Sequence, residues 1–170
     1  MLKITSLAES QDSWDMVVEI FFESSSKKVF KSDTEKNDFL YKYLGFYKDK
    51  YPNIFLVALM DDKVLGYICG ARDSKFENEL YDFLPHYSLF EDLYEKFPAH
   101  LHINLSQNSR GLGVGSKLIE AFEEIVSTSG VHLITGPKAR NRSFYLKNNY
   151  TFECLREFRG LELLFMGKTL

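Results

Sequence analysis

The segment from Leu101 to Gly115 constrains the fold most, because an apolar-alternating stretch runs directly into a glycine-rich turn. It reads LHINLSQNSRGLGVG, and an amphipathic segment follows from about Ser116 to Thr128. The alternation predicts a strand, and the residues after the turn predict a helix. Such a turn can direct several backbone N–H groups at one point, beside the positive end of the helix dipole. The segment therefore predicts a strand–turn–helix unit that can cradle an anion such as a diphosphate.

The glycine spacing in this turn differs from that of the two common nucleotide-binding motifs. A P-loop has Lys and then Ser or Thr after its last glycine, whereas Gly115 is followed by Ser116 and Lys117 in the reverse order. A dinucleotide-binding turn needs G-x-G-x-x-G, but the glycines here alternate at Gly111, Gly113 and Gly115. A generic α/β nucleotide-binding protein is therefore the least favoured interpretation.

Length and composition limit the class of protein. A chain of 170 residues suits one domain, and an apolar share of 45 % argues against disorder. The net charge of −3 gives no general attraction to nucleic acid or to anionic lipid. The N-terminus has no signal-peptide core, and no apolar run has membrane-spanning length. Charge and apolar runs together lead us to expect a protein that binds neither nucleic acid nor a membrane. Cys69 and Cys154 lack metal-ligand spacing, so we expect them to be free buried thiols in a protein of the reducing cytoplasm.

The remaining pattern predicts alternating strands and helices with one interruption. Residues 74–99 break the pattern and predict one or two short inserted helices, with Pro85 in their middle. A capping box, Ser32 to Glu35, opens the second helix, and Gly130 is expected to end the helix after the glycine turn. Predicted strands cover 2–7, 54–60, 64–71, 100–106, 131–135, 151–158 and 161–167, and predicted helices cover about 14–22, 33–47, 116–128 and 141–147.

Two segments together resemble one enzyme family. Arg110 to Gly115 has the pattern R-x-x-G-x-G, which directly after a strand resembles the acyl-CoA pyrophosphate loop of the GCN5-related N-acetyltransferases, the GNAT family. The segment FYLKNNY, Phe144 to Tyr150, is similar to that family's F-Y-x-K-x-G-F segment, with Asn149 at the glycine position. The order of elements also matches over nearly the whole chain. The resemblance implies an α/β (α+β) fold in a single domain, 1–170: a mixed, mostly antiparallel sheet of six to seven strands, flanked by helices and splayed at the acyl-CoA site.

The resemblance implies acetyl-CoA as co-substrate, with no metal. Backbone N–H groups from about Leu112 to Ser116 can hold the pyrophosphate, and Arg110 adds a charged contact. By resemblance, an N–H near Leu105 polarises the thioester carbonyl and Asn141 contacts the pantetheine arm. The alternative is a plain loop whose glycines serve tight packing. The expected coenzyme-binding residues are Leu105, Arg110, Gly111, Leu112, Gly113, Val114, Gly115, Ser116 and Asn141.

The reaction needs a neutral amine, so a base or a water relay must remove a proton from the alkylammonium. Many family members carry Glu or Asp on the strand before the turn, but this chain has neither between His100 and Ser106. His100 and His102 are the substitute candidates, because imidazoles titrate near neutral pH. Tyr145 matches the family tyrosine that protonates the leaving thiolate. For all three residues the alternative is a purely structural role.

The insert is the expected source of acceptor specificity, because its acids and aromatic rings suit a cationic amine. The alternative is a solvated helix with a packed aromatic face. We therefore expect an N-acetyltransferase that moves the acetyl group to a primary amine of a small molecule or peptide by direct attack in a ternary complex. The alternative is a non-catalytic acyl-CoA-binding module. Either would be a monomer or a homodimer.

Overall fold

The computed structural model describes residues 1–170 and divides into two compact units. Unit 1 comprises Met1–Gly70 and His102–Ile125, and unit 2 comprises Ala71–Leu101 and Val126–Leu170. Strand β4 (Ala99–Leu105) and helix α5 (Val114–Val126) each pass along the chain from one unit to the other. Neither unit is one continuous stretch of sequence, and the single domain over 1–170 stays a prediction.

The strands form a seven-stranded sheet with the hydrogen-bonding order β1-β2-β3-β4-β5-β7-β6. Neighbouring strands pair antiparallel at β1–β2, β2–β3, β5–β7 and β6–β7, whereas β4 and β5 are parallel. The expected mixed, mostly antiparallel sheet is therefore confirmed. The strand bounds are β1 (Lys3–Ser6), β2 (Leu56–Met60), β3 (Lys63–Ala71), β5 (Gly130–Thr135), β6 (Phe152–Phe158) and β7 (Leu161–Thr169), beside β4.

The two hairpins close as the sequence predicts. Asp61 and Asp62 have φ of 51° and 60°, and Arg159 and Gly160 have 52° and 81°. Left-handed residues at both central positions define the tight turn whose twist matches that of the flanking strands. The parallel register of β4 with β5 is much shorter, since it consists of Ala99↔Val131 and His100↔His132.

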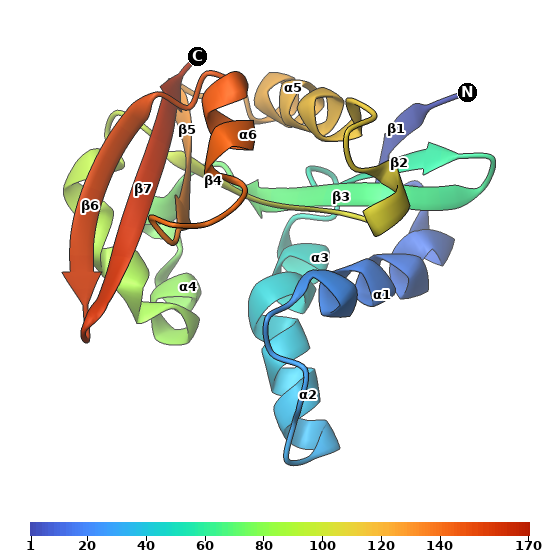
Figure 1. Cartoon of the computed structure of the whole chain (residues 1–170), viewed down its shortest axis with the longest axis horizontal. Coiled ribbons are helices and arrows are strands. Elements are labelled where there is room, and N and C mark those ends of the chain that lie inside the picture. The colour runs from blue at the N-terminus through green and yellow to red at the C-terminus, as the bar shows by residue number, and fades with distance from the viewer. The chain divides into compact units, whose positions relative to one another are not determined.

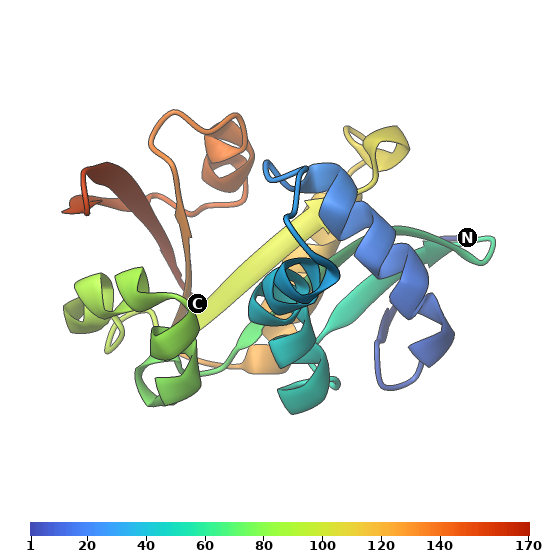
Figure 2. The ribbon, with the colours of Figure 1, turned by 90° about the horizontal axis from the view of Figure 1, so that it is seen from below.

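In unit 1 the helices lie on both faces of the strands. Helix α1 (Trp14–Ser24) follows a 3₁₀ turn over Gln11–Ser13, and α2 (Asp33–Leu40) continues through a π-helical turn (Tyr41–Gly45) into α3 (Phe46–Lys50). Figures 1 and 2 show α1 and α3 against one face and α5 against the other. Buried aromatic and aliphatic side chains fill both interfaces, as the sequence pattern predicts.

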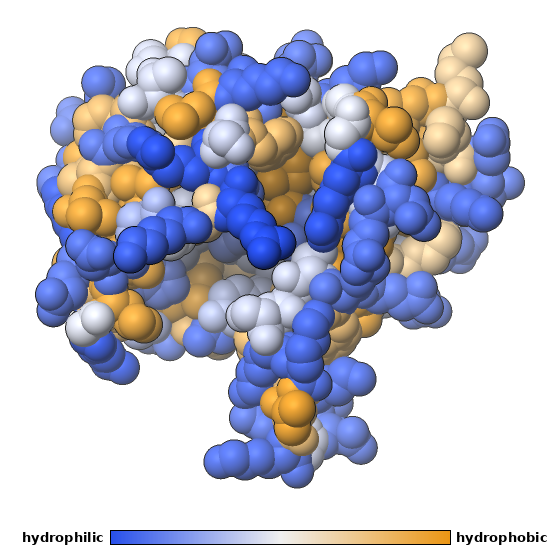
Figure 3. Space-filling model, in the orientation of Figure 1, coloured by the Kyte–Doolittle hydropathy of each residue, from blue (hydrophilic) through white to orange (hydrophobic).

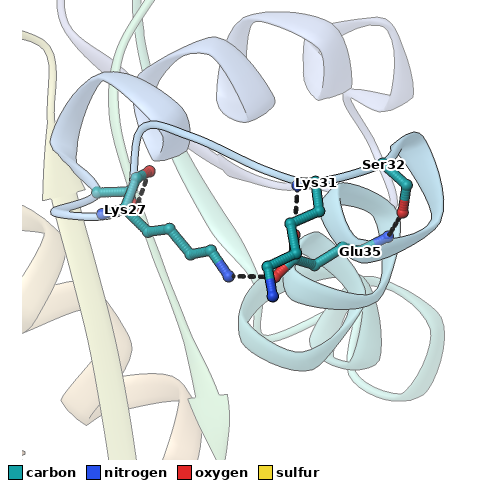
Figure 4. A network of polar contacts seen from close by, with 5 residues as sticks. Lys27, Lys31, Ser32 and Glu35 are labelled. Atoms are coloured by element: carbon teal, nitrogen blue, oxygen red, sulfur yellow. Dashed lines mark hydrogen bonds and ion pairs between the residues drawn. The ribbon is translucent and has the colours of Figure 1, made fainter.

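Helix α2 begins at the predicted cap, but one partner differs. The Ser32 hydroxyl accepts from the Glu35 N–H at 3.1 Å, while the Glu35 carboxylate accepts from the Lys31 N–H at 2.6 Å rather than from the Ser32 N–H (Figure 4). The Lys27 ammonium also donates to Glu35 at 2.8 Å, and this bond and that from Lys31 lower the pKa of the carboxyl. Helix α2 buries no residue, and its surface is mostly hydrophilic (Figure 3).

In unit 2 the predicted insert consists of short helical pieces packed on an aromatic core. They are a 3₁₀ turn (Ser74–Phe76), α4 (Asn78–Phe83) and a 3₁₀ stretch (Pro85–Leu93). The His132 ring is stacked between Tyr94 at 4.9 Å and Phe165 at 4.6 Å between centroids. None of the chain's helices combines the length and apolar character needed to cross a bilayer.

The sequence predicts that Asn149 and Gly130 each end a helix, and the structure confirms one of these two predictions. Asn149 has φ of 69° after α6 (Arg142–Lys147), so the predicted left-handed cap is confirmed. The assignment of Gly130 as the stop of α5 is wrong. Ser127, with φ of 47°, is the left-handed residue after α5, and Gly130 is the first residue of β5. A Cβ on Gly130 would lie 2.5 Å from the Lys96 carbonyl oxygen, so this glycine serves close packing.

Gly130→Ala is expected to lower the free energy of unfolding by about 2 kcal/mol, because the new methyl group meets backbone atoms that cannot move aside. Gly136→Ala is the matched control, since nothing lies within 4 Å of a Cβ there. Urea titration followed by circular dichroism measures both. Equal denaturation midpoints for the two variants would contradict the close packing at Gly130.

Candidate functional site

A β-bulge in unit 1 fixes the start of the glycine turn. Ala58 pairs with Gly66 and Leu59 pairs with Val64, which leaves Leu65 as the extra residue on β3. The Leu65 carbonyl accepts from the Ser106 N–H at 2.9 Å and from the hydroxyl of Ser109, which is fully buried. This one carbonyl therefore holds both the end of β4 and the short 3₁₀ turn that follows it (Gln107–Ser109).

Gly66 brings the end of β4 close to β3. A Cβ at this position would lie 2.8 Å from the Asn104 carbonyl oxygen and would overlap with Cδ2 of Leu105. The Asn104 amide also donates to the hydroxyl of the buried Tyr67 at 2.7 Å. Leu105 is the residue whose N–H is expected to face a thioester carbonyl. It is half-buried, it packs against Gly66, and its neighbour Asn104 is bonded to Tyr67.

The turn itself needs two glycines for their backbone conformation. Gly111 and Gly113 have φ of 79° and 78°, a region that side-chain-bearing residues rarely adopt. Nothing lies within 4 Å of a Cβ built on either residue, so open space surrounds them. Arg110 and Leu112 alternate with these glycines and are exposed, with Leu112 at 64 %. The space beside the turn can admit a ligand.

The start of α5 presents backbone donors to that space. The first hydrogen bond of the helix runs from the Lys117 N–H to the Gly113 carbonyl at 3.2 Å. The N–H groups of Val114, Gly115 and Ser116 precede this bond, so they belong to the first helical turn, whose donors have no acceptor within the helix. No acidic residue lies between Glu95 and Glu120 in the sequence. Donors, helix dipole and charge all favour an anion here, and the residues present fit a pyrophosphate.

The two β4 histidines have different surroundings. His102, in unit 1, is half-buried, and its Nε2 lies 3.1 Å from the hydroxyl of the buried Tyr47 on α3. His100, in unit 2, is fully buried, and its Nδ1 lies 2.7 Å from the hydroxyl of the buried Ser74. The aromatic core encloses His100, with Tyr87 at 5.2 Å between rings. This environment suits a structural side chain, so His102 is the stronger candidate for proton transfer.

Tyr145 and Asn141 lie together in unit 2 at the start of α6. Tyr145 is 5 % exposed, and burial raises the pKa of its phenol, while a hydrogen bond with Asn141 opposes the shift. The phenol is protonated at neutral pH, as in any tyrosine, and burial makes it a weaker acid. Asn141 is exposed, and its Oδ1 accepts weakly from the Thr135 hydroxyl at 3.4 Å. Arg142 forms a two-bond pair with Glu153, at 2.7 and 2.8 Å, which joins α6 to β6.

The aromatic residues of the insert are not an exposed wall, which corrects the expectation that they line an acceptor surface. Tyr87, Phe90, Tyr94 and Phe97 are each no more than 1 % exposed and belong to the core of unit 2. Phe76, at 73 %, is the exposed exception among the large hydrophobic residues of this segment. Two acids of the insert are also already engaged: Asp92 accepts two hydrogen bonds from Arg156, at 2.6 and 2.7 Å, and Glu77 is buried.

Tyr47 is a candidate functional residue that sequence reasoning assigned only to the apolar face of a helix. Its bond to His102 joins residues 55 positions apart, and no local pattern contains that information. Cys69 is buried as expected and Cys154 is half-buried, and both are free thiols. No group of three or more His, Cys, Asp or Glu side chains is arranged to hold a metal ion.

Similar folds occur in solved structures, which include N-acetyltransferases. SsHAT superimposes with a TM-score of 0.72 at 17 % identity, covering 99 % of this chain and 98 % of that one. The ribosomal-protein-alanine N-acetyltransferase of Brucella melitensis gives 0.60 at 19 % identity, covering 100 % and 99 %. The polyamine N-acetyltransferase of Drosophila melanogaster gives 0.63 at 10 % identity, covering all of both chains. These likenesses show the fold.

No curated protein sequence matches this chain significantly. The family model described as the acetyltransferase (GNAT) family matches residues 14–150, which include β4, the glycine turn, α5 and α6. The chain belongs to the GNAT acetyltransferase family.

Proposed function

We propose that this protein is an acetyl-CoA-dependent N-acetyltransferase acting on a primary amine of a small molecule or peptide. Family membership supports acyl transfer in general. The observation that supports the finer proposal most is that two left-handed glycines lead into the first turn of α5, where the N–H groups of Val114, Gly115 and Ser116 have no acceptor within the helix. These donors, with Arg110, suit the pyrophosphate of coenzyme A, and Leu105 is the candidate donor to the thioester carbonyl.

The proposed reaction is direct attack. The amine nitrogen forms a bond to the acetyl carbon, the carbon–sulfur bond breaks, and the thiolate leaves. His102 takes the proton lost by the amine. With Nε2–H donating to the Tyr47 oxygen, Nδ1 is the ring nitrogen that accepts this proton, and the Tyr47 oxygen stabilises the imidazolium. Tyr145 is the proposed proton donor to the thiolate, because it matches the family tyrosine in the FYLKNNY segment, with Asn141 at the pantetheine arm.

The second candidate is an acyl-CoA-binding module without catalysis. It is favoured by the absence of a carboxylate on β4, where many family members place one. Thiol release from acetyl-CoA distinguishes the two functions. The amine panel should include agmatine, a polyamine and a peptide with an N-terminal alanine, because similar folds act on polyamines and on ribosomal-protein alanine. Tight acetyl-CoA binding without any acetylated amine would favour the binding module. We also propose a cytoplasmic location, supported by the two free cysteines.

Gly113→Asp is expected to weaken acetyl-CoA binding at least tenfold, about 1.4 kcal/mol, because a carboxylate would face the phosphate oxygens and the residue has φ of 78°. Gly136→Asp is the control, since it adds the same charge at an open glycine outside the turn. Isothermal titration calorimetry measures both affinities. Wild-type affinity in a folded Gly113→Asp variant would exclude the turn as the pyrophosphate site.

Tyr145→Phe is expected to lower kcat by about 10²-fold or more, the usual contribution of a general acid, while the Kd for acetyl-CoA changes little. The loss should fall on kcat because the hydroxyl acts as the thiolate departs. Steady-state kinetics on an accepted amine, with calorimetry for the coenzyme, separate the two effects. Wild-type kcat in this variant would leave Tyr145 a structural residue.

His102→Gln is expected to remove a rise of kcat/KM with pH in the range where imidazoles titrate, about 6–8. The neutral imidazole is the base, so wild-type activity should fall as pH drops and protonation blocks it. His100→Gln is the comparison. Because His100 is buried and bonded to Ser74, this variant should lose thermal stability but keep the rise of kcat/KM with pH. If kcat/KM of His102→Gln still rises with pH in this range, the titrating group is the substrate amine or another residue.

A further inference from the structure

A cavity of about 680 Å³ lies in unit 1, apart from the residues assigned above. It is formed where the start of α1 meets the end of α3, and it shares no residue with the glycine turn, the end of β4 or His102. Its volume falls within the range of small-molecule sites. The lining residues that carry charge or an aromatic ring are Asp12, Trp14, Asp15, Lys48 and Asp49.

One wall of the cavity is an aromatic ring that already holds a cation. Trp14 is half-buried and packs edge-on against Phe55, with 6.3 Å between centroids and 71° between planes. The Lys48 ammonium lies 4.6 Å from the Trp14 ring centroid. This is a cation–π contact made within the chain, so the ring is held in an orientation that accepts a positive charge.

The carboxylates around this ring are not used by the protein. Asp12, Asp15 and Asp49 are exposed and take part in none of the hydrogen bonds or ion pairs of the structure. With Lys48 they give the cavity a formal charge of −2, three negative charges against one positive. They do not form a group arranged to hold a metal ion.

Helix electrostatics explains two of these carboxylates but not the third. Asp12 and Asp15 lie at the start of the 3₁₀ turn and of α1, where the helix dipole favours negative charge. Asp49 lies in α3, a helix of five residues, whose dipole gives no such reason for a carboxylate there.

We propose that this cavity binds an organic dication, an aliphatic diamine, at a site distinct from the acetyl-transfer site. One ammonium group takes the place of Lys48 against the Trp14 ring, and the other lies among the carboxylates. Two positive charges match the formal charge of −2, and an aliphatic chain suits the apolar part of the wall that includes Pro52. The Lys48 ammonium then competes with the diamine for the Trp14 ring.

The single tryptophan of the chain makes the test specific. Because Trp14 is the only one, intrinsic tryptophan fluorescence reports on the cavity alone. The protein is titrated with 1,4-diaminobutane at constant ionic strength without acetyl-CoA, and a saturable change in emission is expected. Asp15→Asn combined with Asp49→Asn should weaken binding at least tenfold. The Gly113→Asp variant should keep the response, which separates this site from the coenzyme turn.

Lys48→Gln provides the sharper test, because it predicts a gain. Removal of the competing ammonium should tighten diamine binding by about threefold or more. Lys50→Gln is the matched control: it removes the same charge from the same helix, but Lys50 lies over Phe46 and Tyr51 and does not line the cavity. No saturable response in wild type and Lys48→Gln, or equal affinities of the two lysine variants, would overturn the proposal. So would an equal response to 1,4-butanediol or to magnesium chloride.

Discussion

The glycine turn depends on one carbonyl group, which belongs to a residue at a β-bulge. The carbonyl of the bulged residue Leu65 accepts from the Ser106 N–H and from the Ser109 hydroxyl, which both lie just before the turn. Because both donors meet this acceptor, β4 ends at a defined point and the chain enters the 3₁₀ turn in one direction. The left-handed Gly111 and Gly113 then have a fixed starting position. The donors at the start of α5 are thereby oriented before any ligand arrives, which reduces the entropy that binding must offset.

Charge distribution along the chain reinforces this geometry. The stretch between Glu95 and Glu120 contains no carboxylate, although the insert just before it is rich in acids. Carboxylates near the turn would repel a pyrophosphate, and exposed N–H groups beside them would be taken up by their oxygens. The net charge of −3 is therefore a poor guide to what this chain binds, because the distribution of charge decides the local potential.

Short stretches of sequence are sufficient to predict the helices and strands and much of the glycine turn. The hairpins at Asp61 and Gly160 and the cap at Asn149 each follow from the backbone preferences of a few adjacent residues. Gly130 was misassigned because glycine marks both helix ends and close backbone contacts, and the contact with Lys96 depends on tertiary packing. The Leu65 bulge could not be predicted, since it exists only as a mismatch between two strands.

The different surroundings of His100 and His102 also depend on tertiary structure. Both lie at alternate positions of one strand, so the sequence treats them alike, yet one is enclosed by the core of unit 2 and the other contacts Tyr47 in unit 1. In the proposed mechanism this difference has an electrostatic consequence. A carboxylate base becomes neutral when it takes a proton, whereas an imidazole becomes positive. A cation formed on β4 is favoured when an anionic coenzyme is bound to the same unit, and no carboxylate of β4 or the turn is needed to balance it. The loss of the strand carboxylate is thus compatible with catalysis, provided that coenzyme binding precedes proton transfer.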